Sequence, residues 1–178
     1  WKRIPMSIKD AQANVVSYTG IDSNSSWAFS AQSGRTLSKP AGSWTDSTVW
    51  SPGGIPTSAD SVIIPNGYVI TLDAGHHAII GSINIEGTLT VAGSDTLFVF
   101  GNWNNTGTFN SGNGIVIFDS ADQKLGKGTF HNLLLRGSGV KSLSESLKVT
   151  NDFSIQGVNF NDNGNVVHLG GNLSLASS

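Results

Sequence analysis

The sequence predicts an all-β protein folded as a right-handed parallel β-helix of about six short coils, with an N-terminal cap or flap. Three observations support this prediction. Small and turn-forming residues are abundant, with 22 Gly, 25 Ser and 16 Asn in 178 residues. Apolar side chains return at steps of about 20 residues. Within each step they alternate with polar side chains, which is the pattern of a half-buried strand.

The repeat is clearest in the C-terminal half, where apolar residues form two columns at a spacing of 20. The first column is Leu133, Phe153 and Leu173, and the second is Leu135, Ile155 and Leu175. Similar steps relate Ile83 to Trp103, Phe98 to Phe118 and Val140 to Phe160. An antiparallel sandwich, the rival fold, does not require such a return. The columns therefore favour stacked coils, with these side chains in interior rows.

Residues 1–43 lack the repeat and are predicted to be a separate cap, flap or partner-contacting segment. Within them, residues 4–16 have a loosely helical apolar spacing and are interpreted as a short helix or an irregular strand. The β-helix is predicted to span residues 44–178. Two apolar runs in it, residues 97–100 and 115–118, do not alternate, so both faces of these strands are expected to be covered, for instance by the N-terminal segment.

Composition excludes several classes of function. The net charge is −2 and charged residues make up 12%, so the chain lacks the basic surface of nucleic-acid-binding proteins. Without cysteine it forms no disulfide, thiolate metal site or thiol nucleophile. No apolar run reaches the roughly 18 residues of a membrane-spanning helix, so membrane insertion is not expected.

A distinctive motif begins at Trp44. It reads Trp-Thr-Asp-Ser-Thr-Val-Trp-Ser-Pro-Gly-Gly-Ile-Pro at residues 44–56, followed by Asp60, the strand Val-Ile-Ile-Pro at 62–65, Gly67, and Gly-Thr-Leu at 87–89. This motif resembles the opening of secreted bacterial β-helix proteins of the Bacteroidetes type, and it is similar to the extracellular domain family named for its eight glycines. The resemblance covers about 130 residues from Trp44 onward and implies an extracellular or cell-surface location.

The residues of the motif suit the start of a solenoid. The Pro-Gly-Gly-Ile-Pro segment at 52–56 forces a tight, irregular turn. Trp44 and Trp50 are expected to plug the open end of the core. Asp60 is expected to accept hydrogen bonds from turn amides, which makes it a structural cap residue rather than a catalytic one.

The sequence gives little support for catalysis. Its only glutamates, Glu86 and Glu145, lie about three coils apart, or about 14 Å. That separation exceeds the one that paired carboxylates need in glycoside hydrolysis. The Asn-Asp-Asn-Gly-Asn stretch at 161–165 lacks the ligand spacing of an EF-hand and is interpreted as a turn. The chain is therefore predicted to be non-catalytic, with no cofactor and no metal site.

Carbohydrate binding is the competing function. Trp103 lies beside Asn102 and Asn104, and an exposed indole next to amides suits the C–H faces and hydroxyls of a sugar. The alignment of Trp103 with Ile83 indicates instead that the indole points inward. Both interpretations of Trp103 remain open at this stage.

The sequence of the C-terminal residues predicts which partners the chain has. Residues 171–175 continue the repeat without a polar or aromatic cap, which is expected to leave strand edges and an apolar cross-section. Further coils of the same protein or other subunits are the expected partners, and polysaccharide is a further candidate. The expected function is a structural or adhesive module of a secreted or cell-surface protein, with assembly into a fibre as one route. The alternative is a carbohydrate-binding module or an accessory domain of a polysaccharide-active enzyme.

Overall fold

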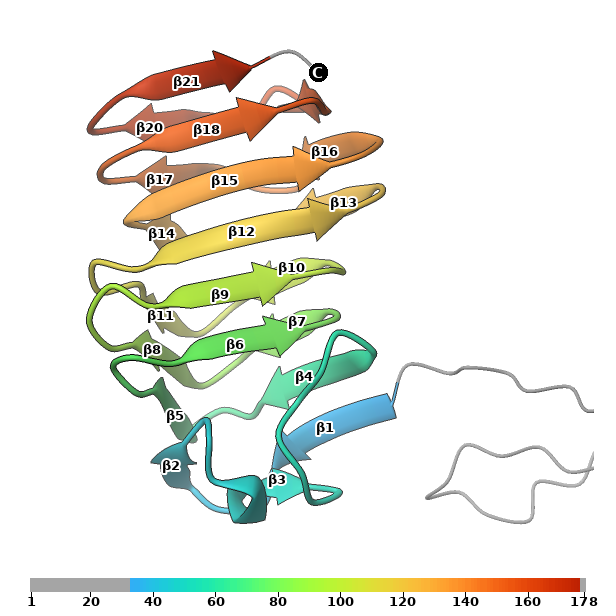
Figure 1. Cartoon of the computed structure of the whole chain (residues 1–178), viewed down its shortest axis with the longest axis vertical. Coiled ribbons are helices and arrows are strands. Elements are labelled where there is room, and N and C mark those ends of the chain that lie inside the picture. The colour runs from blue at the N-terminus through green and yellow to red at the C-terminus, as the bar shows by residue number, and fades with distance from the viewer. Residues whose placement is uncertain (1–32, 177–178) are drawn as a thin grey trace, which may run out of the picture. The chain divides into compact units, whose positions relative to one another are not determined.

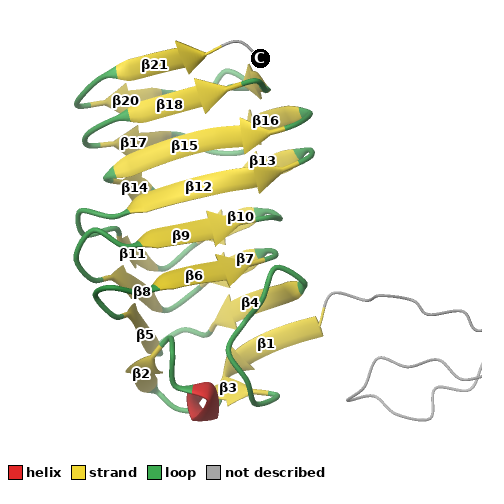
Figure 2. Cartoon of the chain, viewed as in Figure 1, coloured by secondary structure: helices red, strands yellow, loops and turns green. Residues whose placement is uncertain are grey.

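The computed structural model describes residues 33–176, which form a right-handed parallel β-solenoid of six coils (Figure 1). Each coil supplies one strand to each of three sides, and strands on the same side pair in parallel from one coil to the next, except at one break on the second side. The described residues contain a single helical element, the 3-10 turn η1 (Ser47–Val49), as Figure 2 shows. The predicted fold class is confirmed.

The strands of the three sides follow one another in regular order. The first side contains β4 (Asp60–Ile64), β7 (Ile83–Ile85), β10 (Trp103–Asn105), β13 (Gln123–Leu125), β16 (Val140–Leu143) and β19 (Asn159–Asn161). The second contains β5 (Val69–Leu72), β8 (Thr88–Val91), β11 (Thr108–Asn110), β14 (Thr129–Phe130), β17 (Leu147–Val149) and β20 (Val167–Leu169). The third contains β6 (His77–Ile80), β9 (Thr96–Val99), β12 (Ile115–Ser120), β15 (Asn132–Gly137), β18 (Phe153–Gln156) and β21 (Leu173–Ala176).

The solenoid begins earlier than the predicted boundary at residue 43. The strand β2 (Ala41–Ser43) pairs in parallel with β5, and β1 (Ser33–Leu37) pairs antiparallel with β3 (Trp50–Ser51). These pairings supply hydrogen-bond partners to the backbone groups at the strand edges where the solenoid begins. Residues before 44 therefore belong to the sheets. Residues 1–32, including the predicted helix or strand at 4–16 and the cap or flap expected there, lie outside the described residues.

Both predicted columns of the C-terminal half are interior rows. Leu133, Phe153 and Leu173 are partners on successive strands of the third side, as are Leu135, Ile155 and Leu175. Ile83 and Trp103 are likewise partners on the first side. Alternation along each strand turns these apolar side chains inward, and all but Leu173 and Leu175, which are exposed in the last coil, pack in or against one continuous core.

Two of the predicted pairs are wrong by one residue. Phe98 pairs with Ile117 instead of Phe118, and Val140 pairs with Asn159 instead of Phe160. The cause is that coil length varies. The partners Trp103 and Leu125 are 22 residues apart, whereas the partners Ile115 and Asn132 are 17 apart. The corners between strands absorb these differences, so a fixed step of 20 fails where a corner gains or loses a residue.

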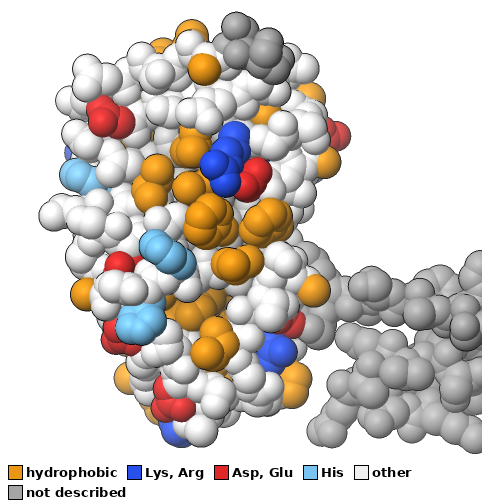
Figure 3. Space-filling model, in the orientation of Figure 1, with side chains coloured by type: hydrophobic (Ala, Val, Ile, Leu, Met, Phe, Trp, Pro, Cys, Tyr) orange, Lys and Arg blue, Asp and Glu red, His pale blue; other side chains and the backbone are white. Residues whose placement is uncertain are grey.

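The third side carries apolar residues on its outer face. Ile79, Phe98, Ile117 and Leu134 are in register there on four successive strands. Hydrophobic side chains gather along the middle of this face in Figure 3. Ile117 is buried and Phe98 is half-buried, so the non-alternating runs contribute to both faces of their strands. The N-terminal segment that was expected to cover them lies outside the described residues.

Close stacking of the coils depends on glycine at the corner between the first and second sides. A Cβ atom on Gly107 would overlap the carbonyl oxygens of Gly87 and Glu86 in the preceding coil. We expect Gly107→Ala to lower the free energy of unfolding by about 2 to 3 kcal/mol, because the backbone must shift to relieve the overlap. Urea unfolding measures the change.

The matched control is Gly34→Ala, since a Cβ atom at Gly34 meets nothing within 4 Å. This substitution is expected to change the free energy of unfolding by no more than about 0.5 kcal/mol. Equal losses of unfolding free energy in the two variants would contradict the conclusion that the corner requires glycine for close stacking.

Candidate functional site

Trp103 lies in the core and is not exposed to a ligand. Its side chain is 2% exposed, and its ring packs edge-on against Phe109 with the ring centroids 4.8 Å apart. The indole Nε1 donates a hydrogen bond to the carbonyl oxygen of Lys127 at 3.2 Å. Since the ring and its donor are both engaged, the structure corrects the sugar-stacking role considered for Trp103.

Asn102 and Asn104 connect neighbouring coils. The Oδ1 atom of Asn102 accepts a hydrogen bond from the backbone N–H of Lys124 at 2.8 Å. The Nδ2 atom of Asn104 donates to Oδ1 of Asn84 at 2.7 Å. These amides form ladders along the solenoid and, with Trp103 turned inward, the three residues do not make a common site.

Trp44 and Trp50 close the core at the N-terminal end of the solenoid. Both side chains are buried, and their rings meet edge-to-face with the centroids 4.8 Å apart. Nε1 of Trp50 donates to the carbonyl oxygen of Trp44 at 2.9 Å. The pair therefore covers apolar side chains of the first coil. Of its two indole N–H groups, that of Trp50 is hydrogen-bonded.

Asp60 ties the entry turn to the first coil. Its Oδ2 atom accepts from the backbone N–H and the hydroxyl of Thr57 at 2.8 and 2.9 Å, and lies 2.9 Å from Nε of Arg35. Arg35 in turn donates through Nη1 to the carbonyl oxygens of Pro52 and Gly53. Sequence reasoning missed Arg35, because it lies in the segment assigned to the cap and no local spacing relates it to Asp60.

A buried lysine, also missed, joins two coils from inside. Lys141 is fully buried, and its Nζ donates to the carbonyl oxygens of Ser120 and Ala121 at 2.6 Å each and to Oε1 of Gln123 at 2.8 Å. Gln123 continues the chain of bonds by donating through Nε2 to the carbonyl oxygen of Val99 at 2.9 Å. The amine is thus enclosed by acceptors and does not face solvent.

Burial sets the protonation of this amine. Loss of water around Lys141 lowers the pKa of its ammonium group from the ordinary value of 10.5, while the negative charges of Asp119 and Asp122 oppose that shift. The four oxygen contacts, which include the carbonyl of Ser138 at 3.3 Å, suit a charged donor. Lys141 therefore has the surroundings of a structural group rather than of a reactive one.

A pocket of about 350 Å³ lies on the second side, where its sheet is interrupted. The strands of this side form two separate sheets, one ending at β11 and the other beginning at β14. The corners on both sides of the break differ in length. Residues 106–107 join β10 to β11, whereas residues 126–128 join β13 to β14. Four residues, 111–114, join β11 to β12, whereas His131 alone joins β14 to β15.

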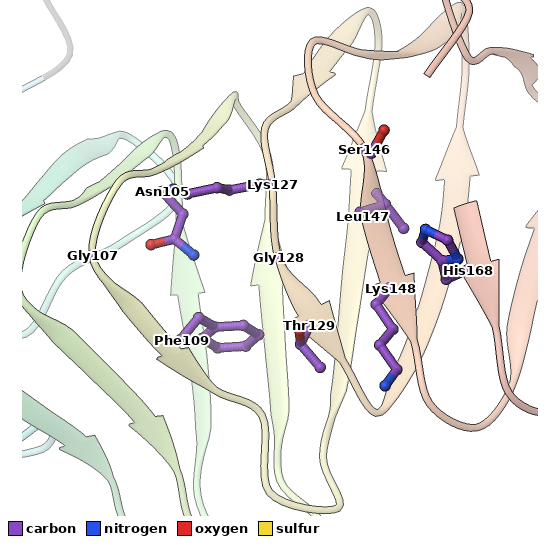
Figure 4. Close-up of a pocket in the computed structure, with 10 residues that line it drawn as sticks. All are labelled: Asn105, Gly107, Phe109, Lys127, Gly128, Thr129, Ser146, Leu147, Lys148 and His168. Carbon is purple, nitrogen blue, oxygen red and sulfur yellow. The ribbon is translucent and has the colours of Figure 1, made fainter. Parts of the chain in front are cut away.

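Figure 4 shows the side chains that line the pocket. Asn105 and Phe109 are buried interior residues that line the floor of the pocket. Polar residues from the later coils form the rim: Lys127, Thr129, Ser146, Lys148 and His168. The Oδ1 atom of Asn105 is buried without a hydrogen-bond partner in the described part of the chain, an arrangement that costs about 1 to 3 kcal/mol.

Residues 33–176 contain neither a cluster of metal-binding side chains nor a membrane-spanning helix. No three His, Asp or Glu side chains between residues 33 and 176 lie close enough together to hold a metal ion. In the turn at 161–165, Oδ1 of Asp162 accepts from the backbone N–H of Gly164 at 2.8 Å, so this carboxylate stabilises the turn. No helix in residues 33–176 is long and apolar enough to cross a membrane.

The fold and the side chains along it define the chain as a parallel β-solenoid protein. Comparisons with protein-family models, curated proteins and solved structures found no match to it. The resemblance to secreted bacterial β-helix proteins stays a prediction from the residues of the Trp44 motif.

Proposed function

We propose that the chain is a non-catalytic structural or adhesive module of a secreted or cell-surface protein, and that a further β-coil completes its C-terminal end. The observation that carries the proposal is the difference between the two ends. Trp44 and Trp50 cover the core at the N-terminal end. At the C-terminal end, Leu173 and Leu175 are 53% and 70% exposed although they continue interior rows.

The last coil presents the surface that every earlier coil offers to the next one. Its strands β19, β20 and β21 are each the outermost strand of their sheet, so one edge of each lacks a strand partner among the described residues. Between these edges lies an apolar hollow of about 520 Å³. Its apolar lining comes from the last two coils: Phe153, Ile155, Val158, Phe160, Val167, Leu169, Leu173 and Leu175. Another β-coil would satisfy both the edges and the hollow.

A second copy of the chain can pair with this end head to tail, through β2, β3 and β6, which are the outermost strands at its N-terminal end. Such a contact does not close on itself and therefore produces a fibre. Further coils of a longer chain would satisfy the same surface within one molecule. An extracellular location is proposed on the resemblance carried by the Trp44 motif, and the adhesive role belongs to the same proposal.

Assembly of the purified chain tests the second-copy route. We expect sedimentation velocity and electron microscopy to show oligomers that lengthen into fibres as concentration rises. The double variant Leu173→Lys with Leu175→Lys should remain monomeric, because two ammonium groups in the hollow oppose burial of the end. Its thermal unfolding should change little, since both side chains are largely exposed in the single chain.

The control is Ile63→Lys, which changes an exposed apolar residue on β4, a strand that lies between β1 and β7 in its sheet, and should assemble as the unmodified chain does. A monodisperse monomer at high concentration would overturn the fibre subunit, as would equal assembly of the double variant. Depolymerisation of any polysaccharide by the chain would overturn the non-catalytic assignment.

A further inference from the structure

We propose that the pocket between β11 and β14 binds an acidic oligosaccharide, with sugar carboxylates at its rim and sugar hydroxyls at its floor. This proposal is independent of how the C-terminal end is completed. The pocket lies on the second side of the solenoid, and its lining residues come from coils three to six.

The floor is polar at a position where the neighbouring coils are apolar. Asn105 continues the interior row of Ile64 and Ile85, yet it carries an amide. Its side chain is 4% exposed and points toward the pocket in Figure 4, with Nδ2 facing the other lining residues and Oδ1 turned to the side of Gly107. Buried polar groups in proteins are normally hydrogen-bonded. A ligand hydroxyl that accepts from Nδ2 would give this amide a hydrogen bond in the pocket.

The rim is positively charged and repeats along the solenoid axis. Thr129, Lys148 and His168 are register partners on β14, β17 and β20, so their backbones lie about 4.8 Å apart. Lys127 adds a second ammonium group to the lining. Neither lysine forms an ion pair within the described range, and no carboxylate lines the pocket. Such a rim favours an anion.

The combination of groups selects the class of anion. The lining spans the strands from β11 to β20, about 14 Å along the axis, which suits an extended ligand. Ammonium groups bind carboxylates, whereas the Asn105 amide and the hydroxyls of Thr129 and Ser146 pair with hydroxyls. Part of the Phe109 ring faces the pocket and suits apolar C–H groups. Inorganic phosphate is too small to span the lining, and an acidic peptide lacks sugar hydroxyls.

Binding is tested by calorimetric titration of the whole chain with four probes at low ionic strength. The probes are a trimer of galacturonic acid, the neutral trimer of galactose, triglutamate and inorganic phosphate. We expect the galacturonate trimer to bind at least about tenfold more tightly than each of the others, and its affinity to fall as salt is added. No binding of the galacturonate trimer, or equal affinity for triglutamate or phosphate, would overturn the proposal.

Two substitutions separate the floor from the rim. Asn105→Leu should weaken galacturonate binding at least about tenfold while raising the midpoint of urea unfolding, because leucine continues the apolar row. Lys148→Met should weaken binding by about five- to tenfold and reduce its salt dependence. The control Lys124→Met alters an exposed lysine on the first side and should bind normally. Unchanged affinity in Asn105→Leu would refute the assignment of the floor.

Discussion

Replacement of Lys141 by methionine is expected to lower the free energy of unfolding by about 3 to 5 kcal/mol. Methionine fills a similar volume but cannot donate to the carbonyl oxygens of Ser120 and Ala121 or to Oε1 of Gln123, which Lys141 bonds at 2.6 to 2.8 Å. Each buried acceptor that loses its donor costs about 1 to 3 kcal/mol. Urea unfolding at neutral pH measures the loss, and Lys124→Met serves as the exposed-lysine control.

The pH dependence of this loss has a definite sign. Burial lowers the pKa of folded Lys141 below 10.5, so the unfolded chain binds more protons at this site in the pH range between the two pKa values. The contribution of Lys141 to the free energy of unfolding therefore rises as pH increases toward 10.5. The stability difference between the unmodified chain and Lys141→Met should widen over that range. A difference that narrows as pH rises would show that the folded pKa is not lowered.

Asp60→Ala is expected to destabilise the chain by about 3 kcal/mol. The substitution leaves the guanidinium of Arg35 without its carboxylate and the backbone N–H of Thr57 without its acceptor. Because Arg35 also holds the Pro52 and Gly53 carbonyls, the entry turn should loosen as well. The midpoint of thermal unfolding should fall by about 6 to 12 °C, as expected for a chain of this size.

A double-mutant cycle identifies the ion pair as the cause. Arg35→Met alone should also destabilise the chain, but Arg35→Met combined with Asp60→Ala should cost clearly less than the sum of the two single losses. Additive losses would mean that the two residues stabilise the turn separately, in disagreement with the 2.9 Å contact between Nε and Oδ2.

The sequence predicted the coils well where their lengths are equal. The columns through Leu133 and Leu135 have the predicted register because β15, β18 and β21 follow one another at a constant step of 20. The same rule failed for Phe98, whose partner Ile117 is only 19 residues away. Alternation fixes which side chains face inward within a strand, but it does not fix how many residues a corner contains.

Polar residues in the interior were the hardest to predict. Lys141 and Gln123 are register partners, each two residues before an interior leucine, so their strand positions face inward. This alternation was a usable signal, but the residue types suggested a surface. Asn105 also occupies a strand position that alternation turns inward, because it lies two residues after the interior Trp103. The pocket itself could not be predicted, because it lies where β11 and β14 do not pair, and alternation within a strand does not report a break between coils.

The difference between the two ends has a consequence for observing this protein unfold. Residues beyond Trp103 contain no tryptophan, so coils four to six have no indole of their own. A solenoid with one covered end loses order most readily from the other, because each coil is held only by its neighbours. Fraying that starts at β21 would leave the emission of Trp44 and Trp50 unchanged until it had travelled most of the length of the rod. Amide hydrogen exchange, which reports every coil, would register that fraying from its first step.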